Sequence, residues 1–134
     1  MAGLIPPLNY GMVEVDLHRS GLPNELNLRF LEQLQLKTVV YLGGDDLLDV
    51  SFTRFLEDHN VNLVHLGTSE SVRALYAPIG EETVLEALRI ILDRANHPML
   101  VCDHQGSHRT GVVIGALRKS LRWSLTSIWD EYRR

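Results

Sequence analysis

The hydrophobic and polar positions along the chain follow two periods, and these predict strands and helices in alternation. Period-two patterns and short apolar runs predict strands, while apolar positions three or four residues apart predict helices. The strands are expected as a pair within Gly11–Ser20 joined near Glu14–Asp16, and then at Lys37–Leu42, Asn62–Leu66 and Pro98–Cys102. The helices are expected from Asn24, from Asp49, over Glu81–Ala95, over Arg109–Leu121 and from Thr126. This alternation is typical of an α/β fold with a mostly parallel central sheet flanked by helices.

Each predicted helix carries an apolar stripe that should face the sheet. Asn24 is expected to cap the first helix. The inward positions are Leu28, Leu31 and Leu34, then Phe52, Phe55 and Leu56, then Val84, Leu85, Leu88, Ile91 and Leu92, and last Val112, Val113, Ala116 and Leu117. The strand Lys37–Leu42 is β-branched and apolar, so it should be buried on both faces.

Length and composition predict one globular domain over residues 1–134, with 45% hydrophobic and 22% charged residues. No apolar run approaches the roughly 20 residues that cross a bilayer, and Met1–Pro7 does not resemble a secretory signal, so we expect a cytoplasmic protein without membrane contact. One cysteine excludes an internal disulfide and a cysteine-based zinc site. The net charge of −4 argues against general nucleic-acid binding, which needs clustered cations.

The segment between the last predicted strand and the following helix carries the candidate chemistry. The amides of a tight loop, together with a helix N-terminus, form a pocket for a tetrahedral anion at the carboxyl edge of a parallel sheet. Gly106 lets the backbone curl, and Arg109 supplies a planar fork for two phosphate oxygens. We expect no metal ion or other cofactor here. The predicted phosphate-binding residues are His104, Gln105, Gly106, Ser107, His108, Arg109 and Thr110.

This loop resembles the Cys-x5-Arg loop of the cysteine-dependent phosphatases. The chain as a whole resembles the plant and fungal atypical dual-specificity phosphatases, a group that includes yeast inositol pyrophosphate phosphatases. The resembling segments, in the same order, are Asn9–Val13, His18–Asn24, Leu36–Leu42, Asn96–Pro98, Gly106 with His108–Gly111, and Leu125–Tyr132. The resemblance implies a dual-specificity-phosphatase-like fold and a phosphate-bearing ligand, such as an inositol polyphosphate or pyrophosphate. It also implies that His108 braces the loop through hydrogen bonds.

Asp103 stands six positions before Arg109, where the resemblance places the nucleophilic cysteine. Cys102 comes one position too early, so its side chain should point away from the loop. A carboxylate is a poorer nucleophile than a thiolate. Two interpretations of Asp103 stay open: a catalytic group of an unusual phosphatase, or a cap that accepts N–H bonds from its own loop and replaces the anion.

Three functions are compatible with this sequence. The first is a catalytically impaired pseudophosphatase that binds a phosphorylated ligand or a protein partner. The second is an active phosphatase on phosphoprotein or inositol pyrophosphate substrates that works without cysteine, with Asp103 and Arg109 as catalytic residues. In that function Glu70, in the long loop predicted over Gly67–Gly80, is a candidate general acid. The third is a structural subunit in a complex of related phosphatase-like proteins.

Overall fold

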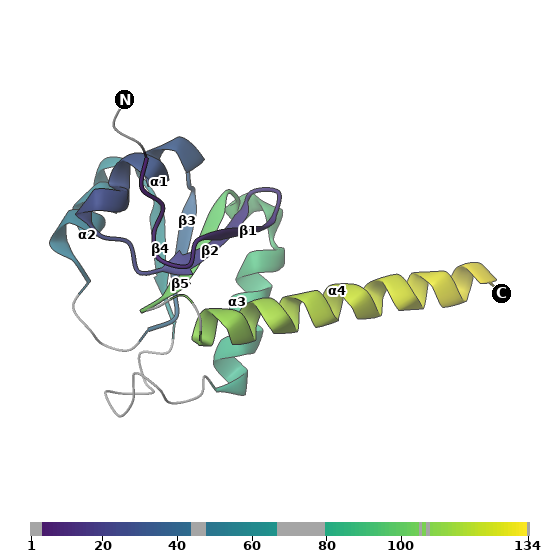
Figure 1. Ribbon diagram of the computed structural model, residues 1–134. Helices are drawn as coiled ribbons and strands as arrows, with labels where there is room; N and C mark the ends of the chain where they lie inside the picture. The colour runs from purple at the N-terminus through teal and green to yellow at the C-terminus, as the bar shows by residue number, and fades with distance from the viewer. Residues whose placement is uncertain (1–3, 44–47, 67–79, 105, 107, 134) are drawn as a thin grey trace.

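The computed structural model describes residues 4–43, 48–66, 80–104, 106 and 108–133, with side chains described as far as Arg122. The strands are β1 (Gly11–Glu14), β2 (Leu17–Gly21), β3 (Thr38–Tyr41), β4 (Asn62–His65) and β5 (Met99–Asp103). The helices are α1 (Leu28–Leu34), α2 (Val50–Asp58), α3 (Glu81–Leu92) and α4 (Arg109–Arg133), with 3₁₀ turns η1 (Glu25–Asn27) and η3 (Arg94–Asn96). The predicted α/β alternation is therefore confirmed (Figure 1).

The five strands form one sheet in the order β1-β2-β5-β3-β4. Only β1 and β2 are antiparallel, whereas the β2–β5, β5–β3 and β3–β4 pairs are parallel. The prediction of a mostly parallel sheet is confirmed. Because β5 lies at the centre, its register brings Asp103 beside Gly21 at the end of β2.

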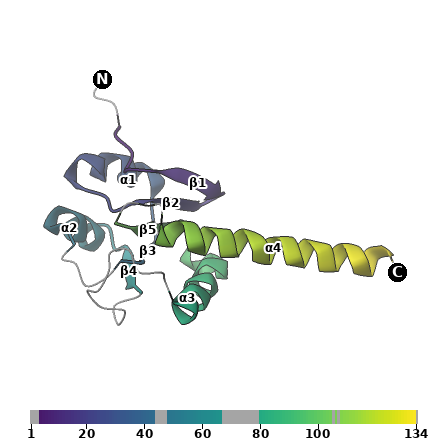
Figure 2. The ribbon, with the colours of Figure 1, turned by 60° about the horizontal axis from the view of Figure 1, so that its bottom comes forward.

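Helices cover both faces of the sheet, and the side chains of β5 alternate between the two layers (Figure 2). Leu100 and Cys102 pack with α1 and α2, whereas Met99 and Val101 pack with α3 and α4. The first layer also contains Leu31, Tyr41, Phe52, Phe55 and Leu56, and the second contains Leu17, Val40, Ala87, Leu88, Ile91, Val113 and Leu117. β3 is buried along its whole length, as its sequence predicts.

Short polar side chains start the first two helices. The Asn24 side chain accepts a hydrogen bond from the backbone N–H of Leu26 at 2.9 Å, and the Asn27 side chain accepts one from the Asn24 N–H at 2.9 Å. The Asp49 carboxylate accepts one from the Ser51 N–H at 3.0 Å. These bonds satisfy amides that have no partner within the helix. The predicted starts are confirmed, with a 3₁₀ turn preceding α1.

Three apolar positions predicted to face the sheet are instead at the surface. Leu85, Leu92 and Val112 are 56%, 55% and 50% exposed. α3 turns a narrower stripe inward, which includes the buried Leu88 and Ile91. The period of a helix identifies its apolar positions, but the neighbouring elements decide how many of them are covered.

The C-terminal part of the chain is one helix, so the prediction of a separate helix from Thr126 is wrong. α4 runs from Arg109 to Arg133 without a break, because neither glycine nor proline interrupts the segment after Leu121. Its outer part extends past the body of the molecule (Figures 1 and 2). In the described part of the chain, no helix is both long and apolar enough to span a bilayer. The predicted loop with Glu70 lies outside the described residues, apart from Gly80.

Replacing Leu31 by alanine should lower the free energy of unfolding by about 2–5 kcal/mol, because the side chain is fully buried and its loss leaves a cavity. Leu26→Ala is the matched control: Leu26 is 69% exposed, and its replacement should change stability by no more than about 0.5 kcal/mol. Urea unfolding followed by circular dichroism measures both. Equal effects of the two substitutions would contradict the described packing of α1.

Candidate functional site

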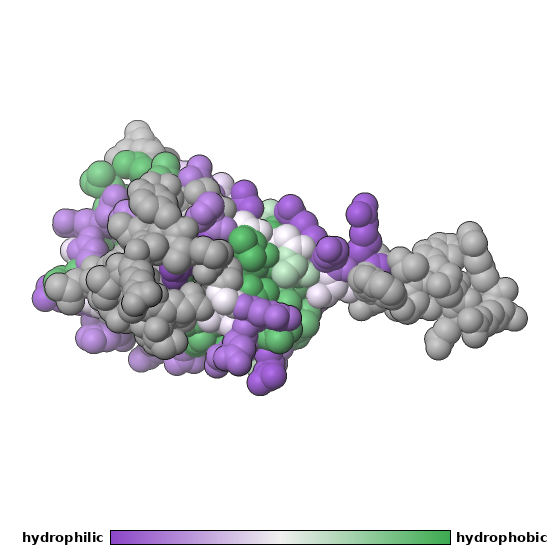
Figure 3. Space-filling view, turned by 90° about the horizontal axis from the view of Figure 1, so that it is seen from below, coloured by the Kyte–Doolittle hydropathy of each residue, from purple (hydrophilic) through white to green (hydrophobic). Residues whose placement is uncertain are grey.

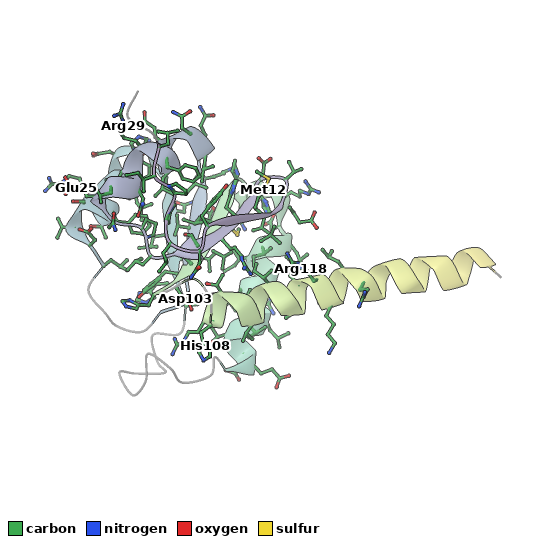
Figure 4. All side chains as sticks on the ribbon, viewed as in Figure 1. Met12, Glu25, Arg29, Asp103, His108 and Arg118 are labelled. Carbon is green, nitrogen blue, oxygen red and sulfur yellow. The ribbon has the colours of Figure 1, made fainter. Side chains whose placement is uncertain are left out.

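The loop after β5 lies at the carboxyl edge of the sheet, where α4 begins. Asp103 is the last residue of β5 and Arg109 is the first residue of α4. Figure 4 shows Asp103 and His108 at this same edge. The backbone N–H of Leu22, just after β2, donates a hydrogen bond to the His104 carbonyl at 3.3 Å. The loop is therefore attached to the neighbouring strand as well as to its own.

Gly106 gives the loop its inward curl. Its φ is +76°, in the left-handed region that residues with a side chain rarely adopt. A side-chain carbon at this position would also overlap the backbone of Ser20 and Gly21 at the end of β2. Both constraints require glycine, so the predicted role of Gly106 in the curl is confirmed.

The carboxylate of Asp103 is bound by the amides of its own loop. One carboxylate oxygen accepts a hydrogen bond from the Gly106 N–H, and the other accepts one from the Arg109 N–H at 2.8 Å. The side chain lies inside the loop, with 4% of Asp103 exposed. Charge-assisted bonds of this kind are stronger than those between neutral groups. Of the two interpretations left open above, this geometry is that of the cap.

Arg109 and Thr110 are the buried polar residues on the helix side of the loop. Arg109 is 5% exposed, and its Nη1 donates a hydrogen bond to the Leu42 carbonyl at 2.8 Å. The Leu42 N–H in turn donates to the Cys102 carbonyl at 2.8 Å, which joins the end of β3 to β5. Thr110 is fully buried, and its hydroxyl forms no hydrogen bond with the described residues. The site therefore holds a cation and a hydroxyl shielded from water.

The two histidines of the loop are exposed. The imidazole of His108 forms no hydrogen bond within the described part of the chain, so the expected bracing of the loop by His108 is not found. Gln105 and Ser107 lie outside the described residues. Among the residues that the structure describes, no group of three or more His, Cys, Asp or Glu side chains is arranged to hold a metal ion.

Cys102 faces away from the loop, as predicted from its place in the strand. It is fully buried in the layer formed with α1 and α2, together with Tyr41 and Phe52. Burial raises the pKa of the Cys102 thiol, and the neighbouring Asp103 carboxylate raises it further. The thiol therefore stays protonated at neutral pH and is not available as a nucleophile.

Backbone groups from two other strands take part in the site, and sequence reasoning missed them. They are the Leu42 carbonyl after β3 and the Ser20–Gly21 backbone at the end of β2. The alternation of strands and helices along the sequence already indicated that other strand ends lie near the loop, because parallel strands end at the same edge of a sheet. Strand order, which places β2 and β3 on either side of β5, was the missing information.

Comparisons with known proteins match nearly the whole chain. A family model described as a tyrosine phosphatase family matches residues 4–134. The chain is 52% identical over 134 residues to a Dictyostelium discoideum protein named "Probable tyrosine-protein phosphatase DG1060", which covers 100% of this chain and 80% of that protein. It is 44% identical over 131 residues to a protein of Oryza sativa subsp. japonica named inositol diphosphatase DSP1, covering 98% of this chain and 58% of the rice protein.

A solved structure agrees with the fold. The core catalytic domain of SIW14 from S. cerevisiae, described as a PP-IP phosphatase in complex with citrate, matches with a TM-score of 0.79 at 36% identity. The match covers 98% of this chain and 78% of that chain. The likeness therefore extends across the sheet, both helical layers and the loop after β5.

Gly106→Ala should destabilise the protein by about 1–3 kcal/mol, because alanine resists positive φ and its side chain would overlap the end of β2. Gly115→Ala is the matched control on α4, since a side-chain carbon there meets nothing within 4 Å. In a helix this change should stabilise by about 0.5–1 kcal/mol. Urea unfolding measures both variants. A Gly106→Ala protein as stable as the control would refute the described loop.

Proposed function

Because the chain belongs to the tyrosine phosphatase family, we propose that it is a phosphatase-like protein that retains an anion-binding loop and has lost cysteine-based catalysis. Asp103 takes the nucleophile position, six residues before Arg109. The protein acts by binding a phosphate-bearing ligand or a protein partner, as a pseudophosphatase. It needs no metal ion or other cofactor for this role.

The observation that carries the proposal is the bond of the Asp103 carboxylate to the amides of Gly106 and Arg109. A phosphate held by the loop needs the same N–H donors, so it must displace the carboxylate. The two anions also repel each other: at about 4 Å and an effective dielectric constant of about 20, two unit charges interact by about 4 kcal/mol before screening by solvent and salt. The loop is therefore partly closed to anions by its own side chain.

The loss of catalysis follows from the nucleophiles that remain. Cysteine-dependent phosphatases attack phosphorus with a thiolate, so that the S–P bond forms as the bond to the leaving oxygen breaks. Water then hydrolyses the resulting phosphocysteine. Cys102 is buried, protonated and on the other face of the strand. The Asp103 carboxylate is a weaker nucleophile than a thiolate, and its two loop hydrogen bonds reduce its electron density further. Neither group replaces the thiolate.

The ligand class is supported by the names of the relatives. One is an inositol diphosphatase from rice and another is a PP-IP phosphatase from yeast. A phosphate-rich inositol is therefore the ligand that we propose for the loop. Arg109 supplies the buried fork for phosphate oxygens, and the Thr110 hydroxyl supplies a donor that the described residues leave unused.

Removing the guanidinium of Arg109 should weaken ligand binding. Arg109→Ala should lower the affinity for an inositol pyrophosphate by one to two decades, about 1.5–3 kcal/mol for a charge-assisted bonding group. Arg109→Lys should recover only part of it, because an ammonium lacks the bidentate geometry. Isothermal titration calorimetry measures both variants, with circular dichroism to verify the fold. Unchanged affinity in a folded Arg109→Ala protein would refute the anion-binding loop.

Replacing the Asp103 carboxylate should open the loop. Asp103→Asn or Asp103→Ser should bind phosphate and an inositol pyrophosphate about tenfold more tightly, because the repulsion is removed and a neutral side chain holds the Gly106 and Arg109 amides less strongly than the carboxylate does. Asp103→Cys should restore at most weak phosphatase activity, since His104, Gln105 and Ser107 add no fixed positive charge to the loop. Calorimetry and phosphate release measure these effects.

Two other functions are outcomes of the same experiments. Turnover by the wild type that depends on Mg²⁺ and is abolished by Asp103→Asn would show an active phosphatase that uses the carboxylate. No protection of the wild type or of Asp103→Asn from thermal unfolding by phosphate, sulfate or an inositol pyrophosphate would show a structural subunit with an unused loop. Unchanged or weaker binding in both the Asn and Ser variants would exclude a loop closed by Asp103.

A further inference from the structure

Three cations gather on the outward side of α4, away from the loop. Arg118, Lys119 and Arg122 are exposed, and with the exposed Gly115 they line a shallow depression of about 620 Å³. Positions three, four and seven residues after Gly115 share one side of a helix. Figure 3 shows hydrophilic side chains where α4 leaves the body of the molecule. We call these four residues the basic face of α4.

The opposite side of α4 is fixed against the sheet. Val113, Ile114 and Leu117 are buried there, so the basic face is directed toward solvent. Among the residues that the structure describes, neither Arg118 nor Lys119 has a hydrogen-bond or ion-pair partner. The chain has a net charge of −4, so a cluster of three cations within five residues is a local positive region on an acidic protein.

We propose that the basic face of α4 binds an acidic helical segment of a partner protein. Arg118 and Arg122 are four residues apart, so they lie about 6 Å apart along the helix axis and match carboxylates spaced four residues apart on a facing helix. Gly115 has no side chain and its Cβ position meets nothing within 4 Å, which leaves room for the backbone of that segment.

The basic face is a separate site from the loop. Arg118 follows Arg109 by nine residues, which is about 14 Å along a helix. The buried Arg109 belongs to the loop, whereas the cations of the basic face are exposed. A partner bound here therefore leaves Asp103 and its hydrogen bonds untouched.

The shape and charge of the basic face favour a protein segment over other anions. Small polyanions bind in pockets that enclose most of their surface, whereas the basic face is an open, shallow depression along the outer side of one helix. Nucleic acids are held by many phosphate contacts, commonly six to ten, and three cations on an acidic protein supply too few. An acidic helix needs only a few carboxylates at this spacing and contributes its own surface to the contact.

The test uses the full chain and a fluorescein-labelled 16-residue alanine-based peptide with glutamates four residues apart. Fluorescence anisotropy in 50 mM NaCl should show saturable binding. Arg118→Glu should weaken it about fivefold, the double variant with Lys119→Glu more than tenfold, and 500 mM NaCl should nearly abolish it. Arg29→Glu is the matched control, because Arg29 is an exposed arginine on α1, distant from Arg118 (Figure 4). It should change the affinity less than twofold.

Several results would overturn the proposal. These are no binding of the peptide, equal binding of a peptide with lysine in place of glutamate, and equal weakening by Arg29→Glu. Binding of inositol hexakisphosphate or a 12-base-pair DNA duplex in preference to the peptide, with the same dependence on Arg118, would assign the face to a small polyanion or to nucleic acid. Asp103→Asn should leave peptide binding unchanged, so failure here and failure of the loop proposal are distinguishable.

Discussion

The burial of β5 on both faces is the constraint on which the rest of the structure depends. Because the central strand is covered by helices on each side, its side chains alternate between two apolar layers. Leu100 and Cys102 belong to one layer, and Met99 and Val101 to the other. Because of this alternation, the thiol of Cys102, the one cysteine of the sequence, lies in an apolar layer and not in the loop. Asp103 is the last residue of the strand, at the start of the loop that leads to α4.

The loop after β5 is held by contacts from both directions. Gly106 packs against the end of β2. The Asp103 carboxylate, at the end of β5, accepts hydrogen bonds from the Gly106 N–H in the loop and from the Arg109 N–H in the first turn of α4. Arg109 reaches the end of β3 through the Leu42 carbonyl. A carboxylate in this position stabilises the loop and competes with any anion for its amides. If the loop binds an anion as we propose, its stability and its ligand binding are therefore opposed at the Asp103 side chain.

α4 connects two surfaces of different chemistry. Its first residues close the loop, where Arg109 and Thr110 are buried polar groups. About two and a half turns later, the helix presents exposed cations at Arg118 and Lys119, while Leu117 packs against α3 and the sheet. One continuous helix thus carries the buried Arg109 and Thr110 at its start and an exposed basic surface farther along. The partner and the ligand that we propose would contact the same helix at different positions.

The sequence by itself determined the order of strands and helices as far as the start of α4, the cap at Asn24, the helix start near Asp49, and the position of the loop. These features depend on local periodicity and local hydrogen bonds, which neighbouring residues encode. Tertiary structure decided the exposure of Leu85, Leu92 and Val112, because the elements packed against a helix determine how many of its apolar side chains are buried. It also decided the place of Leu42 in the site and the bonds from Asp103 to amides three and six residues away. Such contacts depend on strand order and on the curl of the loop, and no local pattern specifies either.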